Sequence, residues 1–181
     1  MKIMVTNATA SFPVLDKPKS FDPSQEKTYS IDGIFDKGSD AHKVLDDAID
    51  KVGTDKWGAD WKDIKPNLES KSRICMRDGS EKGRDEYNGK LFFKASRKES
   101  EGKVKIVDED NMGVTAADGK CYGGSTVNIL VDIWAQDHPL GGKRINAKLL
   151  GVQHVADGEP FGSTVSANDD DFAVLNSQSY L

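Results

Sequence analysis

The sequence has little cysteine and histidine, and this scarcity excludes several classes of site. Among 181 residues there are two cysteines and three histidines. Cys75 and Cys121 are far apart and fit neither a metal-ligand nor a redox spacing, so we expect reduced, structural thiols. The histidines are scattered, and no calcium loop or nucleophile motif is complete. We therefore expect no metal, no cofactor and no catalytic residue, and hence no enzyme.

Long apolar runs are also missing. No segment approaches the roughly 20 apolar residues of a membrane span. The N-terminal stretch "MKIMVTNATASFP" lacks the longer apolar run that a secretory signal needs. These absences predict a cytoplasmic protein with no membrane partner. A hydrophobic fraction of 36% suits a small β-barrel with long polar loops better than an enzyme built on a large core.

Basic residues are absent from the C-terminal segment. The chain has 25 Lys and Arg against 30 Asp and Glu, but no Lys or Arg follows Lys148 while five acidic residues lie beyond it. The rest of the chain is therefore balanced in charge. We predict one domain over residues 1–156 and an acidic, flexible tail over 157–181. Such a tail is either merely solvated or competes for a basic patch on the domain.

Period-two alternation predicts about six strands and a helical insertion. Residues 125–136 alternate most clearly, and Gly151 marks a bulge or bend in the strand that follows. The other candidate strands are residues 27–35, 71–77, 90–98, 103–108 and 144–155, with one short strand from "ASFPVL" in an otherwise loop-like segment 1–28. Since strands and helices do not alternate, the pattern predicts an all-β fold with an antiparallel sheet closed into a small barrel.

The helical insertion is predicted around residues 40–65. Ser39 is a suitable N-cap for a helix that begins at Asp40 and ends at Gly53. Trp57 and Trp61, four residues apart, would share one face of a second short helix. We expect these two rings to pack the insertion onto the barrel and not to contact a ligand.

Aromatic rings beside cations suggest a chemistry for the strand faces. In the strand 90–98, Phe92 shares a face with Lys94 and Lys98, and Trp134 falls on the polar face of its own strand. Single-stranded nucleic acid is held by this combination, because bases stack on rings while cations neutralise phosphates. The stacking candidates are Phe92, Trp134, Tyr87 and Tyr122; the phosphate candidates are Arg73, Arg77, Lys82, Arg84, Lys94, Lys98, Lys143 and Arg144. Alternatively, both main rings lie under the insertion and the cations form a solvated face.

Over most of its length the sequence resembles the single-stranded DNA-binding proteins of tailed bacteriophages. The resemblance is carried by the serial order of "ASFPVLDKPKSF", "KTYSIDGIFDKGS", "DKWGADW", "MRDGSEKGRDEYNGKLFFKAS", "DGKCYGGSTVNILVDIWAQD" and "GGKRINAKLLGVQHVADGEPFG". It implies an OB-fold-like antiparallel barrel of five to six strands with a helical insertion. It further implies a protein that coats single-stranded DNA, largely without sequence preference, during phage replication, recombination or repair in the bacterial host.

The resemblance also gives the acidic tail a role. In such proteins acidic residues beside an aromatic imitate phosphates and a base, and they then recruit replication or recombination proteins. The matching residues are Asp169, Asp170, Asp171 and Phe172. The neutral domain predicts that double-stranded DNA competes weakly. A virion or assembly protein that binds other proteins and no nucleic acid is the alternative, and a nuclease is a third.

Overall fold

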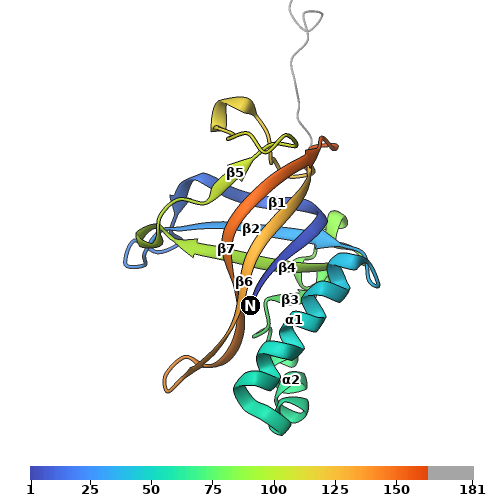
Figure 1. The fold of residues 1–181 in the computed structure, drawn as a ribbon, viewed down its shortest axis with the longest axis vertical. Coiled ribbons are helices and arrows are strands. Elements are labelled where there is room, and N and C mark those ends of the chain that lie inside the picture. Colours follow the sequence, from blue (N-terminus) through green and yellow to red (C-terminus); the bar gives the residue numbers. More distant parts are fainter. Residues whose placement is uncertain (163–181) are drawn as a thin grey trace, which may run out of the picture.

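The computed structural model describes residues 1–162 of the 181 (Figure 1). The strands are β1 (Lys2–Lys19), β2 (Thr28–Phe35), β3 (Met76–Asp78), β4 (Leu91–Lys98), β5 (Lys105–Val107), β6 (Thr126–His138) and β7 (Gly142–Ala156). The α-helices are α1 (Asp40–Trp57) and α2 (Trp61–Ser70). None of the described helices is both long and apolar enough to cross a membrane.

Five of the strands close into a barrel. Going round it, β1 pairs with β2, β2 with β4, β4 with β7, β7 with β6, and β6 again with β1. The β4–β7 pair, in which Ala95 faces Ala147, is parallel, and the other four pairs are antiparallel. β3 extends the sheet beyond β4, and β5 extends it beyond β7. The fold is the predicted OB-fold-like barrel, with one parallel closure.

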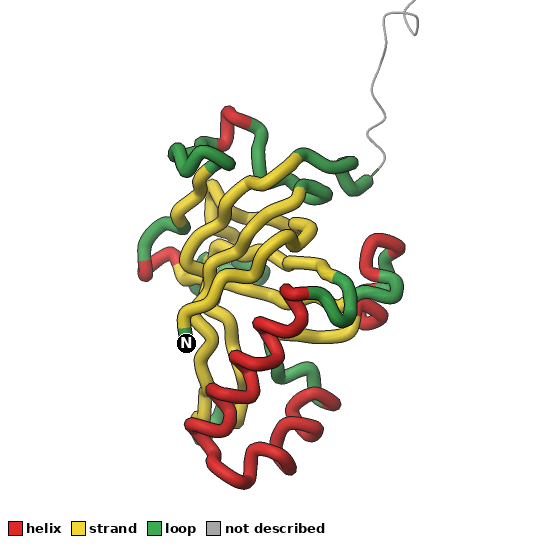
Figure 2. Tube along the Cα trace, turned by 45° about the vertical axis from the view of Figure 1, so that its right-hand side comes forward, coloured by secondary structure: helices red, strands yellow, loops and turns green. Residues whose placement is uncertain are grey.

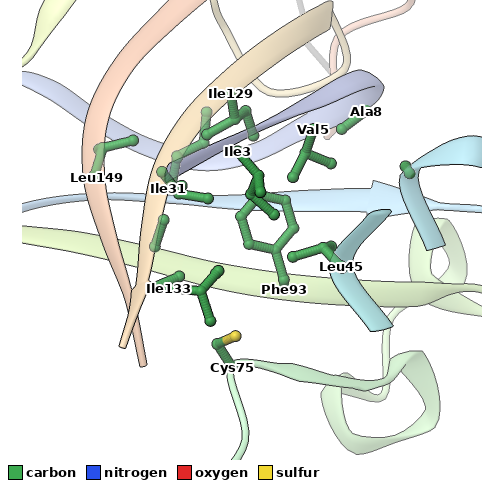
Figure 3. Close-up of a cluster of buried hydrophobic side chains, with 14 of the residues drawn as sticks. Ile3, Val5, Ala8, Ile31, Leu45, Cys75, Phe93, Ile129, Ile133 and Leu149 are labelled. Carbon is green, nitrogen blue, oxygen red and sulfur yellow. The ribbon is translucent and has the colours of Figure 1, made fainter. Parts of the chain in front are cut away.

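The barrel core follows the predicted alternation in β6 and β4. In β6 the positions Val127, Ile129, Val131 and Ile133 are buried, as their spacing predicts, and Trp134 points out. In β4 the inward ring is Phe93, which Figure 3 shows among aliphatic side chains from several strands and close to Leu45 of α1.

The two helices lie together beside the end of the barrel from which the β6–β7 hairpin projects (Figures 1 and 2). Ser39 caps α1, because its hydroxyl accepts a hydrogen bond from the amide of His42 at 3.3 Å. The predicted end of this helix at Gly53 is wrong, since α1 continues to Trp57. A Cβ at Gly53 would lie 2.3 Å from the Trp61 ring, so glycine is needed there for close packing between the helices and not as a stop.

The two tryptophans pack as predicted, but the prediction that they share one helix is wrong, because Trp57 is the last residue of α1 and Trp61 is the first residue of α2. Trp61 is buried, and its ring stacks on that of Trp57 with centroids 5.6 Å apart. The Trp57 Nε1 donates to Asp137 on β6 at 2.9 Å, which ties α1 to the projecting hairpin.

The N-terminal segment differs from the prediction of a single short strand. β1 runs over 18 residues, and its pairing is interrupted by register shifts between Val5 and Ala8 and again between Ser11 and Val14. Such irregularities break the period of two, so "KIMV" and "ATA" do not share one alternation and the sequence pattern does not predict a single long strand. The bulge predicted at Gly151 is present, as a register shift between Gly151 and Leu149.

The first residues beyond β7 are held against the barrel. The Tyr122 hydroxyl donates to the carbonyl of Gly158 at 2.8 Å and accepts from its amide at 3.1 Å. The amide of Phe161 donates to Gly123 at 3.0 Å. The segment predicted as a tail therefore begins with docked residues.

Candidate nucleic-acid interface

The outer face of β4, β7 and β6 forms a groove of about 690 Å³. One wall is the segment between α2 and β3, and the floor is the barrel itself. Its lining includes six basic side chains, Arg73, Arg77, Lys94, Lys98, Arg144 and Lys148, the ring of Trp134, and two carboxylates, Asp132 and Glu101. A small-molecule pocket is usually mostly apolar, so this cationic excess is better suited to a polyanion.

The sheet register brings these side chains together from distant parts of the chain. Trp134 pairs with Asn146 across β6 and β7, and Ser96 pairs with Lys148 where β7 closes on β4. Because alternate residues of β4 point outward, Lys94 and Lys98 stand on either side of Ser96. The groove therefore crosses three strands.

The groove keeps positive charge that is not cancelled locally. Within residues 1–162, Arg73, Lys94 and Arg144 make no ion pair with a carboxylate. Glu101 pairs with Lys148, and this ammonium holds the pKa of the Glu101 carboxyl below its ordinary value. Three unpaired cations around an open groove are therefore available to neutralise phosphates.

Trp134 is the one predicted stacking ring that lies in the groove. Its side chain is 42% exposed, although it stands in the middle of a paired strand. An indole that is exposed to solvent on the outer face of a sheet offers a flat apolar surface on which a base can stack.

The structure contradicts the prediction that Phe92 and Tyr87 offer exposed rings, because both are fully buried. Phe92 does point away from the barrel core, but it packs with Ile34 and Tyr87 in a second cluster outside the barrel. The Tyr87 ring meets it edge-on at 5.3 Å. Between β3 and β4, the connecting segment folds back and covers this part of the outer face.

Buried polar groups hold this cover in place. The Tyr87 hydroxyl donates to Asp32 at 3.0 Å, and Lys82 pairs with the same carboxylate at 2.7 Å. Burial raises the pKa of the Tyr87 phenol, so the hydroxyl stays protonated and keeps donating. Lys82 thus has a structural partner in addition to any role with phosphate.

The remaining predicted residues lie at the margins. Tyr122 binds the segment after β7 and does not line the groove. Lys143 lies over the Trp57 ring at 5.5 Å, in an adjoining hollow to which Arg73 also contributes. Arg84 lies over Phe12 at 4.6 Å, away from the groove. Asp169, Asp170, Asp171 and Phe172 lie outside the described residues.

Sequence reasoning missed two contributors. Lys148 lies on the half-exposed face of β7, and alternation from Arg144 would have found it. Phe21, in the connection between β1 and β2, is 100% exposed and lies 5.9 Å from the Lys94 ammonium. Its signal was a single aromatic in the polar, proline-containing loop "DKPKSFDPSQ", which has no apolar neighbours that could bury it.

Comparison with known proteins identifies the family. The model of the family described as the ssDNA-binding protein of Enterobacter phage Enc34 matches residues 1–180. The chain belongs to this family. Protein p50 of Acyrthosiphon pisum secondary endosymbiont phage 1 is 31% identical over 100% of this chain and 99% of its own.

Solved structures agree with this assignment. The single-stranded DNA-binding protein of bacteriophage Enc34 in complex with ssDNA has a TM-score of 0.71 and 25% identity, with 89% of each chain covered. The gp2.5 single-stranded DNA-binding protein of bacteriophage T7 has a TM-score of 0.63 at 14% identity, over 100% of this chain and 99% of that one. The second likeness concerns the fold alone.

Proposed function

We propose that this member of the Enc34 family binds single-stranded DNA in the groove across β4, β7 and β6 and coats it during phage replication, recombination or repair. The observation that carries the proposal is the exposed Trp134 ring among six basic side chains. Bases of any kind stack on an indole, so binding is largely independent of sequence. The protein acts by binding and not by catalysis, in the cytoplasm of the infected bacterial host.

Each part of the groove has a task. Trp134 stacks on a base, and Phe21 closes on a neighbouring base from the β1–β2 loop. Arg73, Lys94 and Arg144 neutralise phosphates, and Lys98 joins them by exchanging its contact with Glu26, 3.6 Å away, for a phosphate. The role of the β1–β2 loop agrees with OB-folds in general, in which the loop between the first two strands contacts oligonucleotides.

The experiment is a titration of the intrinsic tryptophan fluorescence with oligo-dT at low and high salt. Of the three tryptophans, Trp61 is buried and Trp57 is half-buried against it, so Trp134, which lines the groove and is 42% exposed, should give most of the quenching. We expect quenching that saturates and weakens steeply with salt, because bound phosphates release counterions. A duplex of the same length should compete weakly. Absence of any change at low salt would reject the proposal.

We also propose that the acidic tail competes with DNA for this groove and contacts replication or recombination proteins. Five acidic residues follow the last basic residue, Lys148, and the domain before them has balanced charge. An attached anion acts at high effective concentration. A chain that ends at Gly162 keeps Asp157 and Glu159 in the docked segment but loses the other three acidic residues, and it should bind oligo-dT more tightly than the full chain at low salt. Equal affinity would contradict the competition.

A further inference from the structure

Phe12 is an exposed aromatic ring in an unusual backbone position on β1. Its φ is +45°, a region that bulky residues rarely adopt, and its side chain is 46% exposed. It lies where the pairing of β1 with β2 shifts between Ser11 and Val14, and Pro13, which cannot donate to a ladder, follows it. The bulge thus exposes a large apolar ring to solvent, where the ring adds no packing to the barrel core.

Two cations accompany this ring. The guanidinium of Arg84 lies 4.6 Å from the centre of the Phe12 ring, and the ammonium of Lys82 lies 5.4 Å from it. Lys82 shares its charge with the buried Asp32, whereas Arg84 is 55% exposed and, within residues 1–162, has only a 3.8 Å contact with Glu86. A ring with a partly free guanidinium beside it repeats the chemistry of the groove at a second place.

Contacts connect this place to the groove. Arg77 lines the groove and lies 5.1 Å above the ring of Phe92, and Lys82 lies 4.8 Å from the same ring. Lys82 in turn reaches Phe12. Arg77, which pairs with Glu81 at 3.4 Å, and Lys82, which pairs with Asp32, therefore form with Arg84 a row of basic side chains that leads from the groove to Phe12.

The sheet register gives the length of this path. Trp134 faces Asn146 on β7, Ala147 faces Ala95 on β4, Lys94 faces Asp32 on β2, and Asp32 faces Ser11 on β1. Four steps between neighbouring strands span roughly 19 Å at about 4.8 Å each. Asp32 lies beneath the cover, so a strand on the surface follows a path at least this long. At about 3.4 Å per nucleotide of a stacked strand, at least about six nucleotides separate the two rings.

Resting on the proposed function, we propose that Phe12 is a second stacking site, at which the DNA strand that leaves the groove past Arg77 places another base, with Arg84 on its phosphate. The occupant is single-stranded DNA, because the patch is continuous with the cationic groove and carries the same pairing of ring and guanidinium. Only a strand longer than the separation of Trp134 and Phe12 reaches both sites.

The test uses two replacements of Phe12 in the full chain. Phe12→Asn removes the ring while asparagine tolerates the positive φ, and Phe12→Tyr keeps the ring. With dT15 we expect Phe12→Asn to lose about 5- to 150-fold in affinity and Phe12→Tyr to stay within about twofold of the unchanged protein. With dT4, which cannot span the path, both should bind like the unchanged protein. Met112→Ala, at a 64% exposed apolar side chain in the connection between β5 and β6, is the matched control.

The outcomes separate this proposal from the proposed function. If Phe12→Asn binds dT15 as tightly as the unchanged protein while Trp134→Ala does not, the second site is rejected and the groove remains. In that case the Phe12 patch is free for a protein partner. If dT15 binds neither site, the unchanged protein shows no binding and both ideas fail. An equal loss with dT4 and dT15 would contradict the path and indicate a general effect of Phe12 on the fold, which the melting temperature would confirm.

Discussion

Phe92 and Trp134 both point outward from the same barrel, yet Phe92 is fully buried and Trp134 is 42% exposed. Phe92 lies beneath the segment that connects β3 and β4, with Tyr87 against its ring. Trp134 lies beyond the reach of that segment, in a groove lined by cations. Strand alternation determines which side of a sheet a residue faces, but only the path of the loops determines whether that side is covered.

Removing the buried Phe92 ring should have the largest effect on stability and so tests this contrast most directly. Phe92→Ala empties a site that is 0% exposed, so we expect the free energy of unfolding to fall by about 3–5 kcal/mol. Phe92→Leu should cost less, because it refills most of the volume. Urea denaturation followed by circular dichroism measures both. A stable Phe92→Ala protein that no longer binds oligo-dT would show that this ring, and not Trp134, is the stacking residue.

Trp134 should give the opposite result. Trp134→Ala removes a ring that is 42% exposed, and we expect a loss of about 1–3 kcal/mol in binding to oligo-dT. Stability should change by less than about 1 kcal/mol, as at other surface positions. Trp134→Phe should recover part of the affinity. Fluorescence anisotropy of a labelled oligonucleotide gives the affinity; unchanged binding by Trp134→Ala would mean that bases do not stack in this groove.

The contrast also explains how far the sequence could be read. Alternation placed the outward and inward residues of β4 and β6 correctly, and the serial order of motifs gave the family. What failed depended on the connections between strands. The segment between the strands predicted at residues 71–77 and 90–98 has no pattern that predicts its path, yet its Tyr87 and Lys82 fold back on Asp32, a residue 55 positions from Tyr87. No local pattern encodes that contact.

The two phenylalanines of the first strand and loop illustrate the same limit. Phe12 and Phe21 are apolar, so a pattern of burial alone would place them inside. The bulge before Val14 instead leaves Phe12 46% exposed, and the polar loop around Phe21 leaves that residue 100% exposed. The sequence predicts five of the six basic side chains of the groove, all except Lys148, because charged residues are rarely buried and therefore lie on the surface.

Removing one cation from the groove should change binding less than removing the Trp134 ring, and by a similar amount for any DNA sequence. Lys94 lines the groove and has no ion pair within the described part of the chain, so under the proposed function Lys94→Gln removes a cation that would neutralise a phosphate. We expect the slope of log affinity against log salt to become shallower by about 0.7, with the fold unaffected. Lys43→Gln, on the exposed side of α1, is the matched control. Equal slopes for the two variants would place the phosphates elsewhere.

The smallest effect concerns a buried group in the wall of the same groove. Cys75 lines the groove beside Trp134 but is only 7% exposed, and burial raises the pKa of its thiol to about 12. Burial likewise raises the pKa of Cys121 to about 11. Since the thiolate is the nucleophile, well under about 1% of either cysteine reacts as an anion at pH 8. A disulfide reagent such as DTNB should therefore detect almost no thiol in the native protein and two after unfolding in guanidinium. Rapid modification of Cys75 in the native state, slowed by oligo-dT, would mean that this wall of the groove opens and that the thiol is not permanently buried.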